Sequence, residues 1–558
     1  MDEGTTQERP GADADGGDER PGDLSDLVVV AASETPDKLA LVEADGRSVT
    51  WVELEAEVAR LAHGLSSVGV VAGYRVVMVL ENTIEFVTTY LAVLRVHGVA
   101  VPVNPRSTVG EMVRILADSG ARLVVADASA LGTVRAAIAA LEAAHAGTGA
   151  TEEVAEHLPE DLLVRAAHPR LVVVGGDAAP GEWSYAALRG VETTVEVPRV
   201  RDPERLAVLL YTSGTSGHPR AAMLSHRALL ANIDQVGSVR PAMMHGDDVV
   251  LGVLPLFHVY GLNAVLGSVL RHRAKLVLVR DHDPETILDV VDDEACSVLP
   301  LAPPVFRHWR DDDSLAERLG PVRVILSGSA PLDPDAVARF TASTGLPVHQ
   351  GYGLTEAAPV VTSTLDGDDD PTPGSVGRAL PGIEIRLVEE SGQVPEPGDP
   401  GEIRIRGANL FSGYWPDGAD GPDAEGWWST GDVGLLDPRG ELFLVDRVKE
   451  LVIVSGFNVY PTEVEDVIRE VAGVREAAVI GVADQDTGEA VVAYVVAPET
   501  DPTEVAAEVR AWCEERLARF KVPSRIEVVD SLPVTGTGKV RKGSLRAQER
   551  RRMLELLA

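Results

Sequence analysis

A short run of small and hydroxylated residues, YTSGTSGHPR from Tyr211 to Arg220, has the composition of a phosphate-binding loop. Hydroxyl groups can donate hydrogen bonds to phosphate oxygens, glycines let the backbone fold closely around an anion, and arginine adds a fixed positive charge. The run matches neither the Walker pattern nor GxGxxG. Glycine and serine clusters usually form flexible linkers, but this one interrupts a passage from an apolar strand to a helix starting at Ser225. We therefore predict that it binds phosphate through Thr212, Ser213, Gly214, Thr215, Ser216, Gly217 and Arg220.

The elements that must position this loop alternate between strands and helices. Apolar runs at VVMVL, VAVPV and RLVVA are separated by helix-length stretches, the first from Ile84 to His97 and the second ending at Gly120. Continuous apolar strands with helices between them are typical of parallel sheets covered on both faces. The alternation resumes at Leu206–Tyr211, Lys275–Val279 and Val322–Leu326. We predict an α/β fold with a large N-terminal domain of parallel sheets covered by helices.

The C-terminal third follows a different pattern. After residue 370, runs such as IEIRLVEE and GEIRIRG alternate apolar with polar residues, as half-buried strands do, and predict a β-rich annex. From about residue 448 strands and helices mix again over the length of a small domain. We predict a disordered acidic tail at residues 1–26, a large domain at 27–447 and a small, mobile α+β domain at 448–558.

Composition excludes several classes of protein. The 50 lysines and arginines face 87 aspartates and glutamates, and a net charge of -37 argues against nucleic-acid binding. The two cysteines, Cys296 and Cys513, form no disulfide framework or metal-ligand spacing. The N-terminus does not resemble a secretory signal, and the uncharged stretch Val249–Leu270 contains proline, histidine and asparagine, so it predicts a buried strand, loop and helix and no transmembrane segment. We expect a cytoplasmic protein.

Seven motifs in order resemble the superfamily of acyl-CoA synthetases, peptide-synthetase adenylation domains and luciferases, from about residue 27 to the end. They are YTSGTSGHPR, LPLFHVYGL (Leu254–Leu262), GYGLTE (Gly351–Glu356), GEIRIRG (Gly401–Gly407), STGDVG (Ser429–Gly434), DRVKELVIVSGFNVYPTEVE (Asp446–Glu465) and LPVTGTGK (Leu532–Lys539). Members activate a carboxylic acid with ATP as an acyl adenylate. The resemblance therefore implies that the protein uses ATP and Mg²⁺, with coenzyme A as a further substrate.

The resemblance also implies roles for single residues. It puts Tyr352 against adenine, Thr355 on the α-phosphate, Glu356 on magnesium with Thr212, and Asp432 on the ribose hydroxyls with Arg447 as a second contact. A carboxylate suits both a hard cation and a vicinal diol. It implies further nucleotide contacts at Ser329, Ala330, Gln350 and Gly351.

Five further positions concern adenylation and the acyl transfer that follows it. His258 is similar to the family's gate beside the carboxylate pocket, where we assign it to positioning. Lys539 is expected to bridge the carboxylate and α-phosphate, because a compact ammonium on a flexible stem suits a charge that must arrive and leave. Lys449 occupies the hinge position, so the small domain is expected to swing, withdraw Lys539 and present Ser455 and Gly456 to coenzyme A.

The sequence departs from the family in the phosphate loop, where Arg220 and Ala221 replace the more usual lysine and glycine. The charge survives, but loop closure and nucleotide turnover can change. We predict activation of a medium- or long-chain fatty acid followed by transfer to coenzyme A. Arylpropenoate ligase activity, loading of a carrier protein and a catalytically weak nucleotide-binding homologue remain alternatives. A homodimer is compatible with the sequence.

Overall fold

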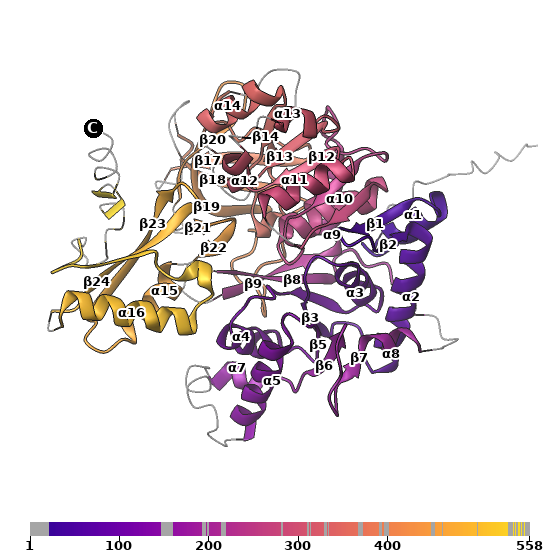
Figure 1. Ribbon diagram of the computed structural model, residues 1–558, viewed down its shortest axis with the longest axis horizontal. Coiled ribbons are helices and arrows are strands. Elements are labelled where there is room, and N and C mark those ends of the chain that lie inside the picture. Colours follow the sequence, from indigo (N-terminus) through magenta and orange to yellow (C-terminus); the bar gives the residue numbers. More distant parts are fainter. Residues whose placement is uncertain are drawn as a thin grey trace, which may run out of the picture.

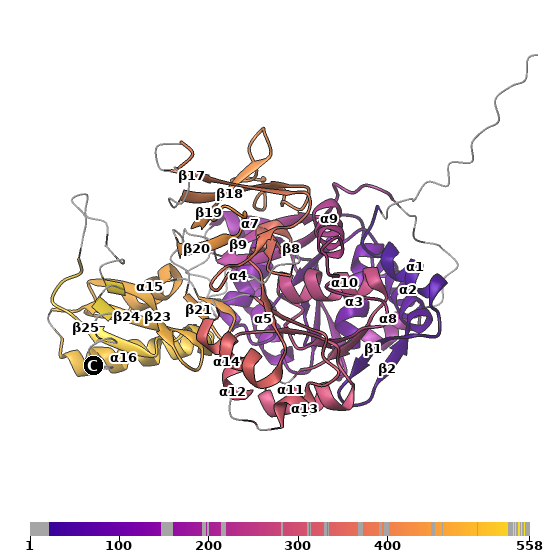
Figure 2. The same ribbon diagram turned by 90° about the horizontal axis from the view of Figure 1, so that it is seen from above.

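The computed structural model contains two large parallel sheets, a β-rich annex and a separate C-terminal sheet (Figures 1 and 2). It describes residues 22–146, 160–191, 197, 200–213, 219–280, 283–309, 312, 314–328, 332, 334–365, 372–389, 393–395, 401–447, 452–459, 461–498, 500–533, 540, 542, 545–546, 548–549 and 552.

The first sheet has seven strands in the order β7-β6-β5-β3-β4-β8-β9, and only β9 runs antiparallel to its neighbour. Its strands are β3 (Arg75–Val79), β4 (Val99–Pro102), β5 (Leu123–Asp127), β6 (Arg170–Val174), β7 (Trp183–Ser184), β8 (Leu206–Ser213) and β9 (Pro219–Ser225).

The second sheet also has seven strands, in the order β14-β13-β12-β10-β11-β1-β2, with β2 antiparallel at one edge. Its strands are β1 (Leu39–Glu43), β2 (Ser48–Thr50), β10 (Val249–Gly252), β11 (Lys275–Leu278), β12 (Val298–Leu301), β13 (Val324–Ser327) and β14 (Val348–Gln350).

Helices cover both sheets and fill the space between them. One continuous apolar core joins a face of each sheet through α1 (Asp26–Glu34), α2 (Trp51–Ser67), α3 (Ile84–Arg95), α8 (Tyr185–Arg189), α9 (His226–Gly237), the π-helix η1 (Tyr260–Gly267) and α10 (Ser268–His272). The outer face of the first sheet packs on α4 (Val109–Ser119), α5 (Leu131–Ala146) and α7 (Glu160–Arg165). The outer face of the second packs on α11 (Pro284–Asp293), α12 (Pro304–His308), α13 (Leu315–Arg318) and α14 (Pro334–Thr344).

The annex is built from antiparallel strands, and so is the C-terminal sheet except for β25, which pairs parallel with β24. The annex holds a four-stranded sheet of β17 (Ile383–Val388), β18 (Gly401–Gly407), β19 (Trp427–Leu436) and β20 (Leu442–Arg447), beside the pair β15 (Thr362–Ser363) and β16 (Arg378–Ala379). The C-terminal sheet contains β21 (Val452–Val454), β22 (Phe457–Val459), β23 (Glu476–Asp484), β24 (Gly488–Val496) and β25 (Arg525–Val528), with α15 (Pro461–Arg469), α16 (Pro502–Arg516) and the short turn η4 (Arg519–Lys521).

The predicted α/β class with a β-rich annex and a small C-terminal domain is confirmed. The helix predicted to end at Gly120 does so, since this glycine takes the left-handed conformation that stops a helix, with φ of 57°. Ser225 caps α9 by accepting a hydrogen bond from the Ala228 amide.

One prediction about the phosphate loop was wrong. The loop does not lead from a strand to a helix, because β9 intervenes and pairs antiparallel with β8 along its whole length. Residues 214–218 lie outside the described residues. Ala221, the departure from the family pattern, lies opposite Tyr211 and is fully buried in the core beneath α4 and α5. Its methyl group is therefore accommodated by packing.

Two other expectations concern the N-terminus and the uncharged stretch. Within the predicted tail, Asp23 and Leu24 are buried, so the packed chain begins before residue 26. The uncharged stretch forms β10, a loop, η1 and α10, as predicted. Among the residues described, no helix is long and apolar enough to cross a membrane.

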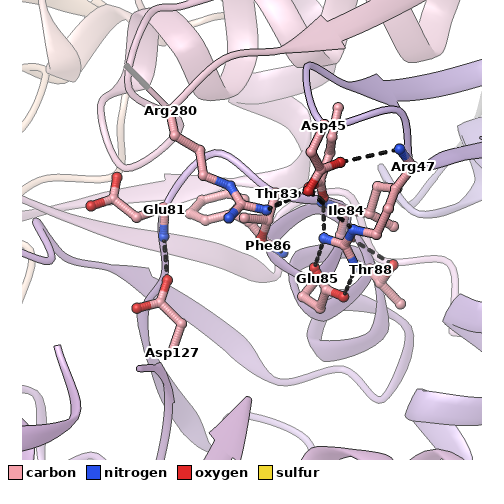
Figure 3. A network of polar contacts seen from close by, with 11 residues as sticks. Asp45, Arg47, Glu81, Thr83, Ile84, Glu85, Phe86, Thr88, Asp127 and Arg280 are labelled. Atoms are coloured by element: carbon pink, nitrogen blue, oxygen red, sulfur yellow. Dashed lines mark hydrogen bonds and ion pairs between the residues drawn. The ribbon is translucent and has the colours of Figure 1, made fainter. Parts of the chain in front are cut away.

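Polar contacts, some buried and some at the surface, join the two sheets next to the start of α3 (Figure 3). Glu43 at the end of β1 accepts a hydrogen bond from the Ile84 amide, and Arg47 bridges Glu43 and Glu85. On the preceding turn, the Glu81 amide donates to Asp127 at the end of β5. The first turn of α3 is thereby tied to the carboxyl ends of strands from both sheets.

Asn82, in the same turn, holds the loop that follows β10. Its Nδ2 donates to the carbonyls of Gly252 and Leu254 at 3.0 Å each, and its Oδ1 accepts from the Leu256 amide at 3.0 Å. The side chain is 5% exposed. One amide group therefore satisfies backbone atoms that water does not reach.

We predict that Asn82→Ala lowers the free energy of unfolding by about 3 kcal/mol, because buried donors and acceptors lose their partners. Thermal unfolding followed by calorimetry measures this change. Asn104→Ala, which removes only a local turn contact to the Arg106 amide, is the control and should shift stability by less than about 1 kcal/mol. Equal melting temperatures for the two variants would contradict the assignment.

Candidate active site

A cavity of about 630 Å³ opens where the two sheets, the annex and the C-terminal segment meet. It is lined by all the predicted site residues whose side chains or glycine backbones the structure describes: Thr212, Arg220, His258, Gln350, Gly351, Tyr352, Thr355, Glu356, Asp432, Ser455 and Gly456. Gly214, Thr215, Ser216, Gly217, Ser329, Ala330, Lys449 and Lys539 lie outside the described residues, as do the side chains of Ser213 and Arg447. The backbone of Arg447 pairs with Asp432 across β19 and β20.

Tyr352 and Asp432 form one polar group of this cavity. The Tyr352 hydroxyl donates to Asp432 Oδ2 at 2.7 Å, and the Asp432 amide donates to Thr430 Oγ1 at 3.1 Å. The Tyr352 amide in turn donates to Thr362 Oγ1 at 3.0 Å. A carboxylate oriented in this way can accept hydrogen bonds from a diol.

Glu356 forms a second group with two residues from distant parts of the chain. It lies in the 3₁₀ turn η3 (Thr355–Ala357), is 6% exposed, and accepts a hydrogen bond from the Tyr414 hydroxyl at 2.5 Å. The Arg220 guanidinium lies 3.8 Å from the centre of the Tyr414 ring and pairs with Asp420 at 2.7 Å. Arg220 thus has partners of its own beside the loop.

Sequence reasoning missed Tyr414 and Asp420. Neither belongs to any of the seven motifs, and nothing in their local pattern marks them as part of a site. Tyr414 reaches Glu356 because its segment pairs with β9 by a bridge to Ala222. Only the folded chain brings these two residues together.

His258 lines the same cavity and lies beside two phenylalanine rings. Its ring centre lies 5.1 Å from that of Phe257 and 6.0 Å from that of Phe457. Burial lowers the pKa of His258 to about 4, so the imidazole is neutral near pH 7. The tight turn around it needs Gly261, since a Cβ there would lie 2.3 Å from the Pro255 carbonyl oxygen. A neutral ring fits the predicted positioning role.

The apolar side chains of the lining, which we call its apolar end, come from α9, η1, β12, β13 and the segments next to them. Its walls are formed mainly by Val236, Met243, Met244, Leu254, Val259, Val265, Val298, Leu326 and Val360. His349 is the exception. It lies beside Leu326 in the strand register and is half-buried, and burial lowers its pKa.

The turn between β21 and β22 reaches this cavity from the C-terminal segment. Ser455 and Gly456 both take left-handed backbone conformations, with φ of 51° and 82°, and the Ser455 amide donates to the Thr487 carbonyl at 2.7 Å. Phe457 follows and stacks on Phe520 at 4.6 Å between ring centres. The turn tip therefore lies where a second substrate can meet the first.

Comparison with known proteins agrees with this arrangement. Residues 28–415 match the AMP-binding enzyme family, and residues 463–539 match the AMP-binding enzyme C-terminal domain. The chain therefore belongs to the AMP-binding enzyme family, and it is an adenylate-forming acid–CoA ligase, as the sequence predicted.

Individual relatives differ in the acid that they use. The chain is 32% identical to 4-coumarate–CoA ligase 5 of Oryza sativa subsp. japonica and 30% identical to the long-chain-fatty-acid–CoA ligase of Bacillus subtilis, covering 94% of each protein and 94% of itself. Among solved structures, the amide bond synthetase McbA of Marinactinospora thermotolerans superposes with a TM-score of 0.78 at 29% identity, over 94% of this chain and 99% of that one. These relatives confirm the class and leave the acid open.

The half-buried imidazole of His258 predicts a pH-dependent stability. Its pKa is about 4 when folded against 6.5 as the ordinary value, so the unfolded chain binds the proton more readily. The stability that the neutral ring contributes is complete above about pH 6.5 and is lost as the pH falls towards 4.

Relative to His258→Phe, the wild-type protein should lose about 2 kcal/mol more free energy of unfolding between pH 7 and pH 5. Urea unfolding of both proteins at each pH measures this difference, and the other titrating groups cancel in the comparison. If the free energy of unfolding changes with pH equally in the two proteins, folding does not lower the pKa of His258.

Proposed function

We propose that this enzyme activates a medium- or long-chain fatty acid with MgATP and transfers the acyl group to coenzyme A. The observation that supports this most is the lining of one cavity, which combines charged and polar side chains with apolar ones. Tyr352, Asp432, Glu356 and Arg220 lie at the polar end, and the other end is apolar. A nucleotide suits the first environment and a hydrocarbon chain the second.

In the first half-reaction a carboxylate oxygen attacks the α-phosphorus and pyrophosphate leaves. Because both reactants are anions, the site must stabilise the negative charge that develops on the phosphoryl oxygens. Arg220, Thr355 and the incoming Lys539 are the groups that we assign to this task. Asp432 with Arg447 holds the ribose, and Tyr352, Gln350, Gly351, Ser329 and Ala330 hold the adenine end.

Magnesium fits the polar end. Glu356 and Thr212 supply the oxygen ligands that this ion prefers, and Mg²⁺ usually takes one or two protein ligands and completes its shell with phosphate and water. Within the described part of the chain, no cluster of three or more acidic, histidine or cysteine residues could hold a metal on its own. When bound, the ion would neutralise charge on the phosphates.

In the second half-reaction the thiol of coenzyme A attacks the acyl carbonyl and AMP leaves. We assign the path of the thiol to the turn at Ser455 and Gly456, where the absence of a side chain at Gly456 leaves room for a pantetheine arm. Lys449 is the proposed hinge, so that the boundary between large and small domains falls near residue 448. Closure and opening about this hinge would separate the two half-reactions.

The lining of the apolar end supports a monocarboxylic acid. The described arginine and lysine that line the cavity, Arg220 and Lys542, already pair with Asp420 at 2.7 Å and with Glu465 at 2.6 Å. A dicarboxylate such as malonate would bury an unpaired charge there, which is costly. A hydrocarbon chain instead gains from burial against methionine and valine side chains.

The test is a panel of acetate, malonate, octanoate, palmitate and 4-coumarate with MgATP, each with and without coenzyme A, analysed for AMP and thioester by mass spectrometry. A thioester from octanoate or palmitate supports the proposal. Adenylate that accumulates in the presence of coenzyme A would instead favour carrier-protein loading, and absence of AMP with every acid would favour the weak nucleotide-binding homologue.

Lys539→Ala should lose adenylation by a factor of about 100 or more, because the charge that bridges the two anions is removed. Its transfer of a supplied acyl adenylate to coenzyme A should remain within about threefold of wild type, because we assign Lys539 no role in that step. Lys539→Arg, which keeps the charge, is the matched control. Equal losses in both half-reactions would remove Lys539 from the proposed role.

A second candidate acid is an arylpropenoate, and His349 is the observation that favours it. This histidine faces the otherwise apolar end from β14, beside Leu326, and its lowered pKa keeps it neutral. A neutral imidazole can exchange a hydrogen bond with a ring hydroxyl, which a fatty chain lacks.

If this second candidate is right, the wild-type enzyme should have a higher kcat/KM for 4-coumarate than for cinnamate. His349→Leu should remove that preference by a factor of about 10, the value of one hydrogen bond in a buried site. The ratio of the two kcat/KM values is the readout, so a general loss of activity does not affect it. An unchanged ratio would leave the fatty acid as the preferred substrate.

A further inference from the structure

The short turn η4 ties the C-terminal segment to the large domain through a buried lysine. Lys521 Nζ lies against Glu111 Oε1 on α4 and is 2.8 Å from Glu463 Oε1 on α15. The side chains of Lys521, Glu111 and Glu463 are 13%, 14% and 7% exposed. In both views the C-terminal sheet lies at one end of the molecule, against the side that carries α4 (Figures 1 and 2).

These two ion pairs differ in what they join. Glu463 and Lys521 belong to the same C-terminal segment, so their contact does not depend on how that segment is oriented. Glu111 lies 410 residues before Lys521, on the outer face of the first sheet. The Lys521–Glu111 contact therefore exists only in orientations that bring η4 against α4.

The neighbouring residue of η4 connects the same turn to the cavity. Phe520 stacks on Phe457, which directly follows Gly456, and Phe457 faces His258 across 6.0 Å. Two neighbouring residues of η4 therefore make different contacts. Lys521 contacts α4, and Phe520 contacts Phe457, the residue that follows the turn at Ser455 and Gly456. An orientation that keeps Lys521 on Glu111 also keeps the turn in the cavity.

The charged groups around this contact shift the pKa of Glu463. Burial raises the pKa of Glu463, Lys521 opposes that shift, and the charge of Glu111 adds to it. Arg114, one turn along α4 from Glu111, also opposes the rise in the pKa of Glu463. When the segment leaves α4, Lys521 loses its contact with Glu111, so this pair contributes to the free-energy difference between the two orientations.

We propose that the Lys521–Glu111 pair is a positioning contact for thioester formation: it holds the orientation in which the Ser455–Gly456 turn lines the cavity and has no part in adenylate formation. This inference rests on the proposed two-step function. Both residues act through the turn, since neither lines the cavity. Weakening the pair should lower the population of the transfer-competent orientation and leave the chemistry at phosphorus unchanged.

Glu111→Gln is the variant that isolates this contact. Glu111 also closes a capping box at the start of α4, where its Oε2 accepts from the Thr108 amide at 2.9 Å and its own amide donates to Thr108 Oγ1 at 3.3 Å. Glutamine serves equally well at this capping position, so the helix start is retained while the charge is lost. Unchanged thermal unfolding verifies that the variant folds.

Two assays separate the half-reactions. Acid-dependent exchange of pyrophosphate into ATP reports adenylation, and single-turnover reaction of a supplied acyl adenylate with coenzyme A reports transfer. Glu111→Gln should slow transfer about tenfold and change exchange by less than about twofold. Lys521→Met removes the contact with Glu111 together with the contact with Glu463. The double variant should therefore transfer no more slowly than Lys521→Met alone, because that variant already lacks the contact with Glu111.

Glu55→Gln is the matched control. It removes a carboxylate of similar burial that pairs with Arg95 at 2.6 Å within the large domain, and neither half-reaction should change selectively. Equal slowing of both half-reactions by Glu111→Gln, or no slowing of transfer, would overturn the positioning role. Absence of pyrophosphate exchange in the wild-type enzyme with every acid is a different result, which would reject the proposed function itself.

Discussion

Both large sheets pack on one shared layer of helices, and the contacts across that layer determine where the cavity lies. Asn82 and Glu43 join the start of α3 to the carboxyl ends of β1 and β10. The carboxyl ends of parallel strands are where loops of different strands converge, so a ligand site forms there when two sheets meet. The loop that carries His258 follows β10 directly and takes its position from Asn82.

Polar side chains at the cavity are already paired with one another. Tyr352 orients Asp432, Tyr414 binds Glu356, and Arg220 lies between Tyr414 and Asp420. Groups held in this way need little rearrangement when a charged ligand arrives, which is the physical basis of electrostatic preorganisation. The apolar end is lined mainly by valine, leucine and methionine side chains, so its preference for an acid depends on shape and on His349.

The C-terminal segment contributes to the same cavity from a separate sheet. Its turn at Ser455 and Gly456 reaches the cavity, while Lys521 holds the segment on α4 from the other side. The proposed two-step reaction uses two orientations of this segment, and the Lys521–Glu111 contact belongs to one of them. An ion pair that forms in one orientation can bias the balance between them.

The sequence by itself determined the α/β class, the annex and the membership of the AMP-binding family. These follow from apolar periodicity and from short motifs, which are local properties, as the helix ending at Gly120 and the cap at Ser225 show. Only the tertiary structure decided that β9 follows the phosphate loop and that Tyr414 meets Glu356. The same holds for His349 beside Leu326 and for Lys521 on Glu111, because these contacts join residues far apart in the chain, and no local pattern records which distant segments will pack together.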